Sequence, residues 1–112
     1  MSAPKWKLDN ITAILDRNNL QNDAFVDEMM PIEPVADKWR AFGWHVDEID
    51  GHDMAQVVDA LEKAKAHRGG PTMIVANTVK GKGVSYMENV CEWHGKAPCQ
   101  EEADQALTEL RR

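Results

Sequence analysis

Residues 72–83 read Thr-Met-Ile-Val-Ala-Asn-Thr-Val-Lys-Gly-Lys-Gly, and this stretch decides the fold. The part from Met73 to Val79 is mostly apolar and β-branched, which predicts a strand buried inside a sheet. The strand leads directly into a loop that carries two lysines and two glycines. Ligands of open parallel sheets bind beyond the carboxyl ends of the strands, so the sequence predicts a ligand-binding loop here.

Apolar patterns on both sides of this stretch predict two more strands and three helices. Residues 11–15 form a short continuous apolar run, which predicts a second strand buried on both faces, and residues 44–49 alternate, which indicates a strand at or near a sheet edge. Helical spacing begins near Pro34, begins again after a capping residue at Asp53, and returns near the C-terminus. The residues that mark the three helices are Val35, Trp39 and Phe42; Met54, Val57, Val58, Leu61 and Ala64; and Ala103, Ala106, Leu107 and Leu110.

The predicted order is therefore strand, helix, strand, helix, strand, loop, helix. Strands that alternate with helices imply right-handed crossovers, so we expect the α/β class, with a small, mostly parallel sheet and flanking helices. The length predicts a single domain over residues 1–112. A sheet of so few parallel strands is expected to leave one strand edge open, which favours association with another chain.

The charge balance narrows the classes of function. The chain has 13 Lys and Arg against 19 Asp and Glu, a formal net charge of −6, which disfavours a nucleic-acid-binding protein. No apolar run approaches the roughly 20 residues that span a membrane, and no signal peptide is recognisable, so we expect a cytoplasmic protein without a membrane partner. A cationic loop in an acidic chain suggests a small anionic ligand, although the plainer interpretation is a loop of solvated lysines.

Cys91, His94 and Cys99 form the spacing Cys-x2-His-x4-Cys, which raises the question of a zinc site. Structural zinc sites have four ligands, and the sequence offers no second paired cluster. Two free thiols are the ordinary interpretation in a reducing cytoplasm.

Several segments, taken together, resemble the thiamine-diphosphate domain of the transketolase family. They are residues 15–21, 41–46, 49–53, 80–83 and 93–98, in the family's order, and the resemblance runs from about Lys7 to Leu110. The family also has an upstream Gly-Asp-Gly motif whose aspartate is a metal ligand. Only 17 residues precede Asn18 here, and none of them forms that motif. The chain therefore resembles the C-terminal part of the domain, and we expect a truncated domain.

The resemblance also implies roles for particular residues. Asn18 would offer its side-chain oxygen, and Leu20 its backbone carbonyl, to the Mg²⁺ that bridges the cofactor diphosphate to the protein. Without the resemblance, Asn18 would be interpreted as part of an ordinary Asx turn. Lys80 and His94 would lie at the cofactor, and His94 is the catalytic candidate because an imidazole there could donate to phosphate or to a developing oxyanion.

The function that the resemblance implies is transfer of a two-carbon ketol unit between sugar phosphates, as in the pentose phosphate pathway, with thiamine diphosphate carrying the carbanion chemistry. We expect a fragment or split piece of such an enzyme, inactive alone and binding thiamine diphosphate and Mg²⁺ weakly. Its partner would be a second copy or a complementing transketolase chain. Two alternatives stay open: a stand-alone non-catalytic module that dimerises or binds a partner, and a piece of deoxyxylulose-phosphate synthase, which the residues 93–96 disfavour.

Overall fold

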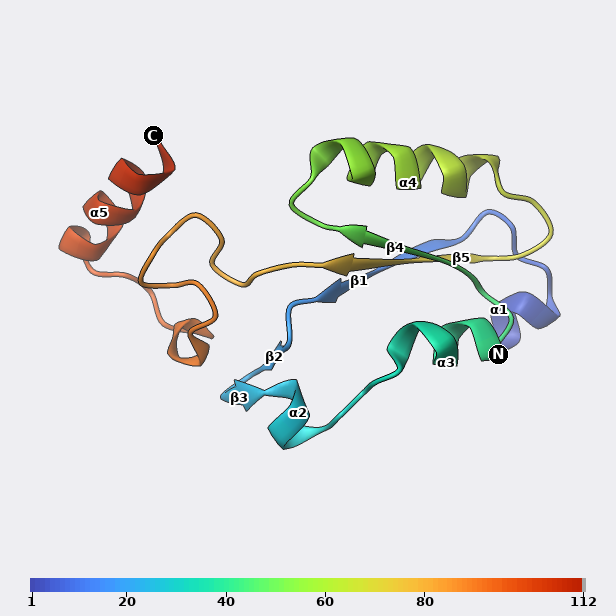
Figure 1. Ribbon diagram of the computed structural model, residues 1–112, viewed down its shortest axis with the longest axis horizontal. Helices are drawn as coiled ribbons and strands as arrows, with labels where there is room; N and C mark the ends of the chain where they lie inside the picture. The colour runs from blue at the N-terminus through green and yellow to red at the C-terminus, as the bar shows by residue number, and fades with distance from the viewer. Residues whose placement is uncertain (112) are drawn as a thin grey trace. The chain divides into compact units, whose positions relative to one another are not determined.

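The computed structural model describes residues 1–111 and divides the chain into two compact units, each of which is described by itself (Figure 1). The sheet unit comprises Met1–Arg17 and Ile32–Thr78, and the loop unit comprises Asn18–Pro31 and the chain from Val79 onward. The single-domain organisation of residues 1–112 stays a prediction. No helix within residues 1–111 is both long and apolar enough to cross a membrane.

The sheet unit is built on three parallel strands in the order β1-β5-β4. They are β1 (Thr12–Arg17), β4 (His45–Asp50) and β5 (Thr72–Asn77), and the helices of this unit are α1 (Ser2–Lys5), α3 (Val35–Ala41) and α4 (Met54–Ala66). Figure 1 shows α3 and α4 on opposite sides of the sheet. The predicted α/β class, with a small parallel sheet and flanking helices, is confirmed.

Two apolar clusters fill the two faces of the sheet. On the α4 face, the buried residues are Ile49, Ala60, Ala64, Ile74 and Ala76. On the α3 face, Val35 packs against Met73 and Val75, and Trp39 lies partly buried beside them. Alternate residues of β5 thus pack into the clusters on opposite faces of the sheet. This explains why the central strand is apolar at every position from 73 to 76.

The prediction for β5 is confirmed, although the strand ends at Asn77 rather than Val79. The prediction that residues 11–15 are buried on both faces is wrong, because β1 lies at the edge of the sheet and its burial alternates along the strand. Ile14, at its centre, is 61% exposed. A continuous apolar run does not distinguish a central strand from an edge strand whose faces are only partly covered. The edge position of β4 was predicted correctly.

Both longer helices of the sheet unit begin where the sequence predicts. The Glu33 Oε2 atom accepts the Val35 N–H at 3.0 Å at the start of α3. Asp53 caps α4 by accepting the Ala55 N–H at 2.9 Å. Asp53 Oδ1 also accepts the Gln56 N–H at 3.4 Å, and the side-chain carbonyl of Gln56 accepts the Asp50 N–H at 3.0 Å in the preceding turn.

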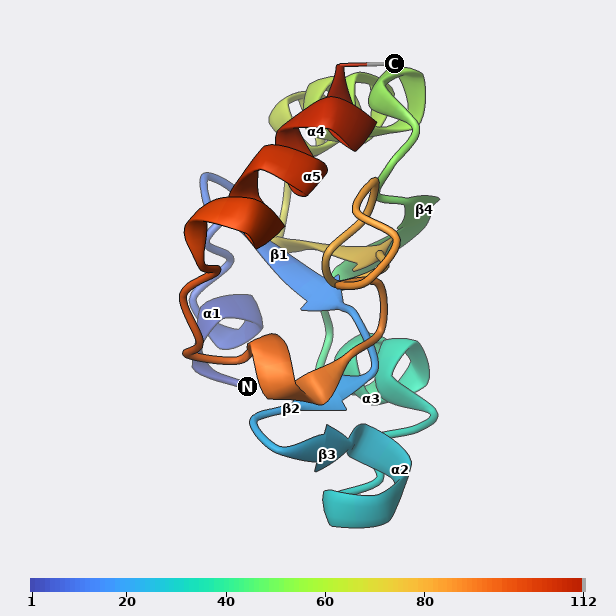
Figure 2. The ribbon, with the colours of Figure 1, turned by 90° about the vertical axis from the view of Figure 1, so that its left-hand side faces the viewer.

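The loop unit contains short elements and one longer helix. The elements are β2 (Leu20–Gln21), β3 (Ala24–Phe25), α2 (Val26–Met29), the 3₁₀ turn η1 (Cys91–Trp93) and α5 (Gln100–Leu110). Figure 2 shows β2, β3 and α2 next to one another. Residues 20–32 have no clear hydrophobic period, because elements of two to four residues are too short to produce one.

Helix α5 and the loop that precedes it are joined by polar contacts. The backbone N–H and the hydroxyl of Ser85 donate to the two carboxylate oxygens of Glu109, at 2.6 and 2.8 Å. The Tyr86 hydroxyl donates to the carbonyl of Glu102 at 2.5 Å. The final helix, predicted from residues 103–110, therefore holds the long loop in a defined conformation.

Candidate functional site

A hollow of about 270 Å³ lies within the loop unit and collects the residues that the sequence singled out. Its lining residues are Asn18, Leu20, Gln21, Asn22, Lys80 and His94. We call it the Lys80 hollow. It brings together two segments some 60 residues apart in the chain, and all four predicted site residues line it. Gln21 and Asn22 were not predicted, because their only signal was their position next to Asn18 and Leu20.

A tight turn presents Asn18 and Leu20 to this hollow. The Asn18 Oδ1 atom accepts the Leu20 N–H at 3.0 Å, so the Asx turn considered from the sequence is present. Asn19 has a φ of 61°, and its carbonyl accepts the Val26 N–H at 2.9 Å, which ties the turn to the hairpin of β2 and β3. A carbonyl oxygen carries two lone pairs, so one on Asn18 Oδ1 is still available for a ligand.

Lys80 enters the hollow from a loop that folds back on itself. Its carbonyl accepts the Asn89 N–H at 3.0 Å. Gly81, next to it, has a φ of 75°, and a Cβ atom there would lie 2.5 Å from the Met87 carbonyl oxygen. Only glycine fits this position, since a side chain would meet both a left-handed backbone and a main-chain atom.

The two lysines of the loop have different electrostatic surroundings. Within residues 1–111, the Lys80 ammonium has no ion pair with a carboxylate, whereas Lys82 Nζ lies 3.7 Å from Glu88 Oε1. An ammonium without a carboxylate beside it is suited to bind an anion as a point charge. The contrast favours Lys80, rather than Lys82, as the anion-binding lysine.

His94 follows η1 and is exposed at the rim of the hollow. Its backbone N–H donates to the Cys91 carbonyl at 2.8 Å. The neighbouring Trp93 is anchored by a hydrogen bond from its Nε1 to the Tyr86 carbonyl at 3.0 Å, and the Lys96 ammonium lies 4.1 Å from its ring centroid. The anchored Trp93 therefore fixes the backbone that carries His94.

The arrangement of Cys91, His94 and Cys99 gives no support to a zinc site. No group of three His, Cys, Asp or Glu able to hold a metal is found in the described part of the chain. Both cysteines are free thiols, and the Cys99 side chain accepts a backbone N–H as part of the capping box of α5.

The other histidines belong to the sheet unit. His45 and His67 stack on each other, with ring centroids 4.5 Å apart. His52 lies in the turn before α4, where its backbone N–H donates to Asp50 Oδ1 at 2.9 Å. None of these three lines the Lys80 hollow as the described residues define it.

The chemistry of the Lys80 hollow fits a diphosphate held with a hard cation. The amide oxygens of Asn18, Gln21 and Asn22 and the carbonyl of Leu20 are the neutral oxygen ligands that Mg²⁺ accepts. Lys80 and His94 are groups that bind phosphate oxygens. No carboxylate is among the lining residues of this part of the chain, so the oxygen donors there are all uncharged. The four residue roles drawn from the sequence stay predictions.

Comparison with known proteins agrees with this chemistry. Residues 1–111 match the family described as transketolase, thiamine diphosphate binding domain. The chain is 44% identical over its whole length to the 6-deoxy-6-sulfo-D-fructose transketolase subunit SqwG of Clostridium sp. (strain MSTE9), of which it covers 41%. It is 38% identical to an apulose-4-phosphate transketolase subunit of Phocaeicola vulgatus, over 98% of this chain and 39% of that protein.

A solved structure matches the fold as well. The transketolase of Campylobacter jejuni superposes on 98% of this chain with a TM-score of 0.88 and 32% sequence identity, and the match covers 17% of that protein. The chain thus spans about two fifths of the length of the subunits that it resembles. It belongs to the transketolase family, within the thiamine diphosphate-binding domain.

Proposed function

We propose that this chain supplies the wall of a transketolase-type site that faces the metal and the diphosphate of thiamine diphosphate. The observation that carries the proposal is the Lys80 hollow, where an oxygen-rich turn meets a histidine and a lysine that has no carboxylate partner within residues 1–111. The enzyme to which the chain contributes would transfer a two-carbon ketol unit between sugars that carry an anionic group.

Each residue has a distinct task in this proposal. Asn18 and Leu20 would hold Mg²⁺ through a side-chain and a backbone oxygen, and Lys80 would neutralise the diphosphate. His94 would donate a hydrogen bond to a phosphate oxygen or to an oxyanion that develops during the reaction, which makes it the proposed catalytic residue. Thiamine diphosphate, when bound, supplies the stabilisation of carbanions that side chains lack.

The names of the relatives support the proposals on substrate and partner. One relative is named for 6-deoxy-6-sulfo-D-fructose and the other for apulose 4-phosphate, and each is named as one subunit of its transketolase. A sulfonate and a phosphate are both anions, so we propose an anionic sugar as the substrate class. We also propose a cytoplasmic enzyme in which a complementing transketolase chain completes the site. Family membership disfavours a stand-alone non-catalytic module, and these names lend no support to a deoxyxylulose-phosphate synthase.

The experiment that tests the proposal is a titration of the ¹⁵N-labelled chain with thiamine diphosphate and Mg²⁺, followed by amide chemical shifts. We expect shifts in residues 18–22, at Lys80 and at His94. Lys80→Ala should weaken the apparent affinity by roughly tenfold or more, because a hydrogen bond to a charged group contributes about 1.5–3 kcal/mol. Lys82→Ala is the matched control, since Lys82 already has Glu88 as a neighbour. Shifts confined to the sheet unit, or an equal loss in both variants, would contradict the proposal.

A further inference from the structure

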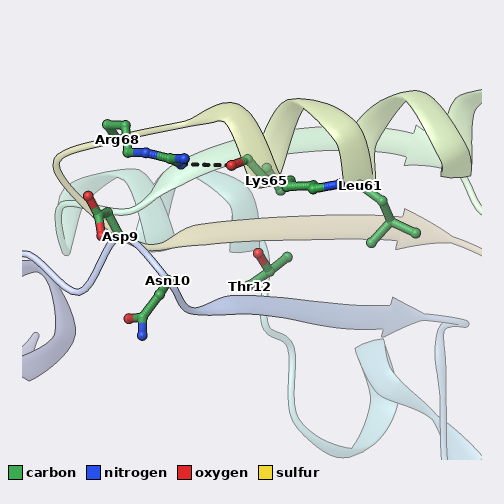
Figure 3. A pocket seen from close by; sticks show the side chains of 7 residues that line it. Asp9, Asn10, Thr12, Leu61, Lys65 and Arg68 are labelled. Atoms are coloured by element: carbon green, nitrogen blue, oxygen red, sulfur yellow. Dashed lines mark hydrogen bonds between the residues drawn. The ribbon is translucent and has the colours of Figure 1, made fainter.

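Polar contacts outside the Lys80 hollow are found in both units, and they hold different parts of the chain. In the sheet unit, a hollow of about 520 Å³ is lined in part by the end of α4 (Figure 3). Arg68 lines it and donates to the carbonyls of Lys65 and His67, at 2.7 and 2.8 Å, so this cation stabilises the end of its own helix. In the loop unit, the polar contacts instead lead from α5 to the residue before His94.

That residue, Trp93, is half-buried and is contacted by two other side chains. Its Nε1–H donates to the Tyr86 carbonyl at 3.0 Å, and the ring centroids of Tyr86 and Trp93 lie 5.3 Å apart at an interplanar angle of 58°. The Lys96 ammonium lies 4.1 Å from the centroid of the Trp93 ring. Aromatic pairs and cation–π contacts at such distances are attractive, so the indole has a defined position in the loop.

Both neighbours of Trp93 are tied to Glu102, in the first turn of α5. The Tyr86 hydroxyl donates to the Glu102 carbonyl at 2.5 Å, and the Lys96 ammonium donates to Glu102 Oε1 at 3.3 Å. The other carboxylate oxygen accepts the Cys99 N–H at 2.8 Å. The contacts form a closed circuit through Tyr86, Trp93, Lys96 and Glu102, which we call the Tyr86 clamp.

His94 lies between two residues of this clamp, because only His94 and Gly95 separate Trp93 from Lys96. The His94 N–H donates to the Cys91 carbonyl at 2.8 Å, and Gly95 has a φ of 89°. The His94 side chain is exposed. The backbone of His94 is therefore held from both sides, whereas its imidazole stays accessible to a ligand.

The ionisable groups of the clamp keep one protonation state around neutral pH. Desolvation, followed by the charges of Glu102 and Glu109, raises the pKa of the Tyr86 phenol above its ordinary value of 10.0. The hydrogen bond from Cys99, followed by the one from Lys96, lowers the pKa of the Glu102 carboxyl below 4.5. The phenol therefore remains a donor, and the carboxylate remains charged beside Lys96.

We propose that Tyr86 is a positioning residue for His94: by holding the Trp93 indole against α5, it keeps the His94 imidazole at the rim of the Lys80 hollow. This inference rests on the proposed function, in which His94 donates to a phosphate oxygen or to an oxyanion. Tyr86 is not among the described residues that line the hollow, so it acts through Trp93 and His94. A misplacement of about 1 Å can cost a reaction on the order of a hundredfold, which is why a group far from the chemistry matters.

Backbone ¹⁵N relaxation of the ligand-free chain tests the positioning directly. The His94 amide of the wild type should have an order parameter of about 0.85, typical of rigid backbone. Tyr86→Phe removes only the hydroxyl and should lower this value toward about 0.6. Ser85→Ala is the matched control, because its hydroxyl also donates to α5, at 2.8 Å, but to Glu109 at the opposite end of the helix from Glu102. An unchanged value in Tyr86→Phe, or an equal loss in both variants, would overturn the proposal.

A second variant keeps the test decisive if circular dichroism shows that Tyr86→Phe is unfolded. Trp93→Phe keeps an aromatic ring and removes the N–H that donates to the Tyr86 carbonyl. The order parameter of the His94 amide should fall in this variant as well. A folded Trp93→Phe chain with a rigid His94 amide would contradict the proposed role of the clamp.

The apparent affinity for thiamine diphosphate with Mg²⁺, measured from amide shifts, distinguishes positioning from a general loss of structure. Tyr86→Phe should weaken it by about threefold, because only part of the population then holds His94 in the binding conformation. In a His94→Ala background the same substitution should change nothing, since both residues act through one imidazole. An equal loss in the two backgrounds would overturn the proposal.

This design also separates failure of the inference from failure of the proposed function. If His94→Ala binds thiamine diphosphate and Mg²⁺ as the wild type does, the proposed role of His94 in the Lys80 hollow is wrong. The order parameters, which are measured without ligand, then still decide whether Tyr86 positions His94.

Discussion

The position of Lys80 depends on the glycine that follows it. Gly81 combines a φ of 75° with a main-chain atom, the Met87 carbonyl oxygen, 2.5 Å from where a Cβ would stand. Gly95, in the same unit, has a φ of 89° but nothing within 4 Å of its missing Cβ. Substituting each glycine in turn therefore distinguishes the free-energy cost of the left-handed backbone from that of a steric clash.

We predict that Gly81→Ala destabilises the loop unit more than Gly95→Ala does. The left-handed conformation alone costs a non-glycine residue about 1–2 kcal/mol, and only position 81 adds a clash. Denaturant unfolding of both variants, followed by circular dichroism, measures the difference. Equal losses would mean that the loop moves away from the added methyl group without cost.

Glu33 joins the start of α3 to β1. Its Oε2 accepts the Val35 N–H, and its Oε1 accepts the Arg17 Nε–H at 2.6 Å, with an ion pair to the Arg17 guanidinium. The hydrogen bond from Val35, followed by that from Arg17, lowers the pKa of the Glu33 carboxyl below its ordinary value of 4.5. The charged form is thus favoured in the folded state.

We predict that this carboxyl contributes to the loss of stability in acid. A lowered folded-state pKa means that the contribution is present above about pH 4.5 and is lost as the pH falls through the folded value. Glu33→Gln should therefore be less stable than the wild type at neutral pH, and the difference should shrink as the pH drops below 4.5. Thermal unfolding from pH 7 to pH 3 tests this, and a difference that is constant with pH would contradict it.

At the scale of elements, β1 and β5 show how similar sequences have different environments. Both are rich in Ile, Leu, Val and Ala at their centres, and Ile14 and Ile74 are register partners. Strand β5 lies between two other strands and has a helix over each face. Strand β1 lies at the edge of the sheet, and α4 does not cover its Ile14 side chain. Position in the sheet, rather than composition, sets how much each isoleucine stabilises the fold.

This pair supports a direct comparison of stability. Ile74→Ala should reduce the free energy of unfolding by about 2–5 kcal/mol, because it leaves a cavity at a position that is 1% exposed. Ile14→Ala should change it by about 0.5 kcal/mol or less, since the side chain is largely in solvent. Both should be measured by denaturant unfolding. Similar losses for the two variants would contradict the exposure of Ile14.

For the whole molecule, our proposal gives the Lys80 hollow the groups for one side of a bound metal and diphosphate. Its oxygen donors are neutral, and magnesium sites in proteins usually include one or two carboxylates together with the phosphates. The chain matches about two fifths of each transketolase subunit to which it was compared. We therefore propose that activity needs groups from polypeptide beyond these 112 residues.

We predict that the 112-residue chain binds thiamine diphosphate and Mg²⁺ no more tightly than the millimolar range, about −4 kcal/mol, and does not transfer a ketol unit by itself. Isothermal titration calorimetry measures the first, and a coupled assay with a ketose phosphate donor and an aldose phosphate acceptor measures the second. Micromolar or tighter binding by this chain alone would show that the Lys80 hollow is sufficient for the cofactor.

The order of β1, α3, β4, α4, β5 and α5 could be read from the sequence alone, because the apolar pattern of each is set by which residues it must bury. The short elements α1, β2, β3 and α2 were not predicted. The family followed from residues at fixed spacings, since Asn18, Lys80 and His94 keep their order along the chain whatever the packing. Glycine at position 81 and a cap at Asp53 are likewise local requirements of the backbone.

Only the tertiary structure decided which strand lies at the edge, because a run such as 11–15 looks the same whether one neighbour or two lie beside it. It also decided that Gln21 and Asn22 share a hollow with Lys80, and that Lys80 lacks the carboxylate neighbour that Lys82 has, within the residues described. These are properties of side chains that come together from distant segments, and local spacing does not encode the distances between them.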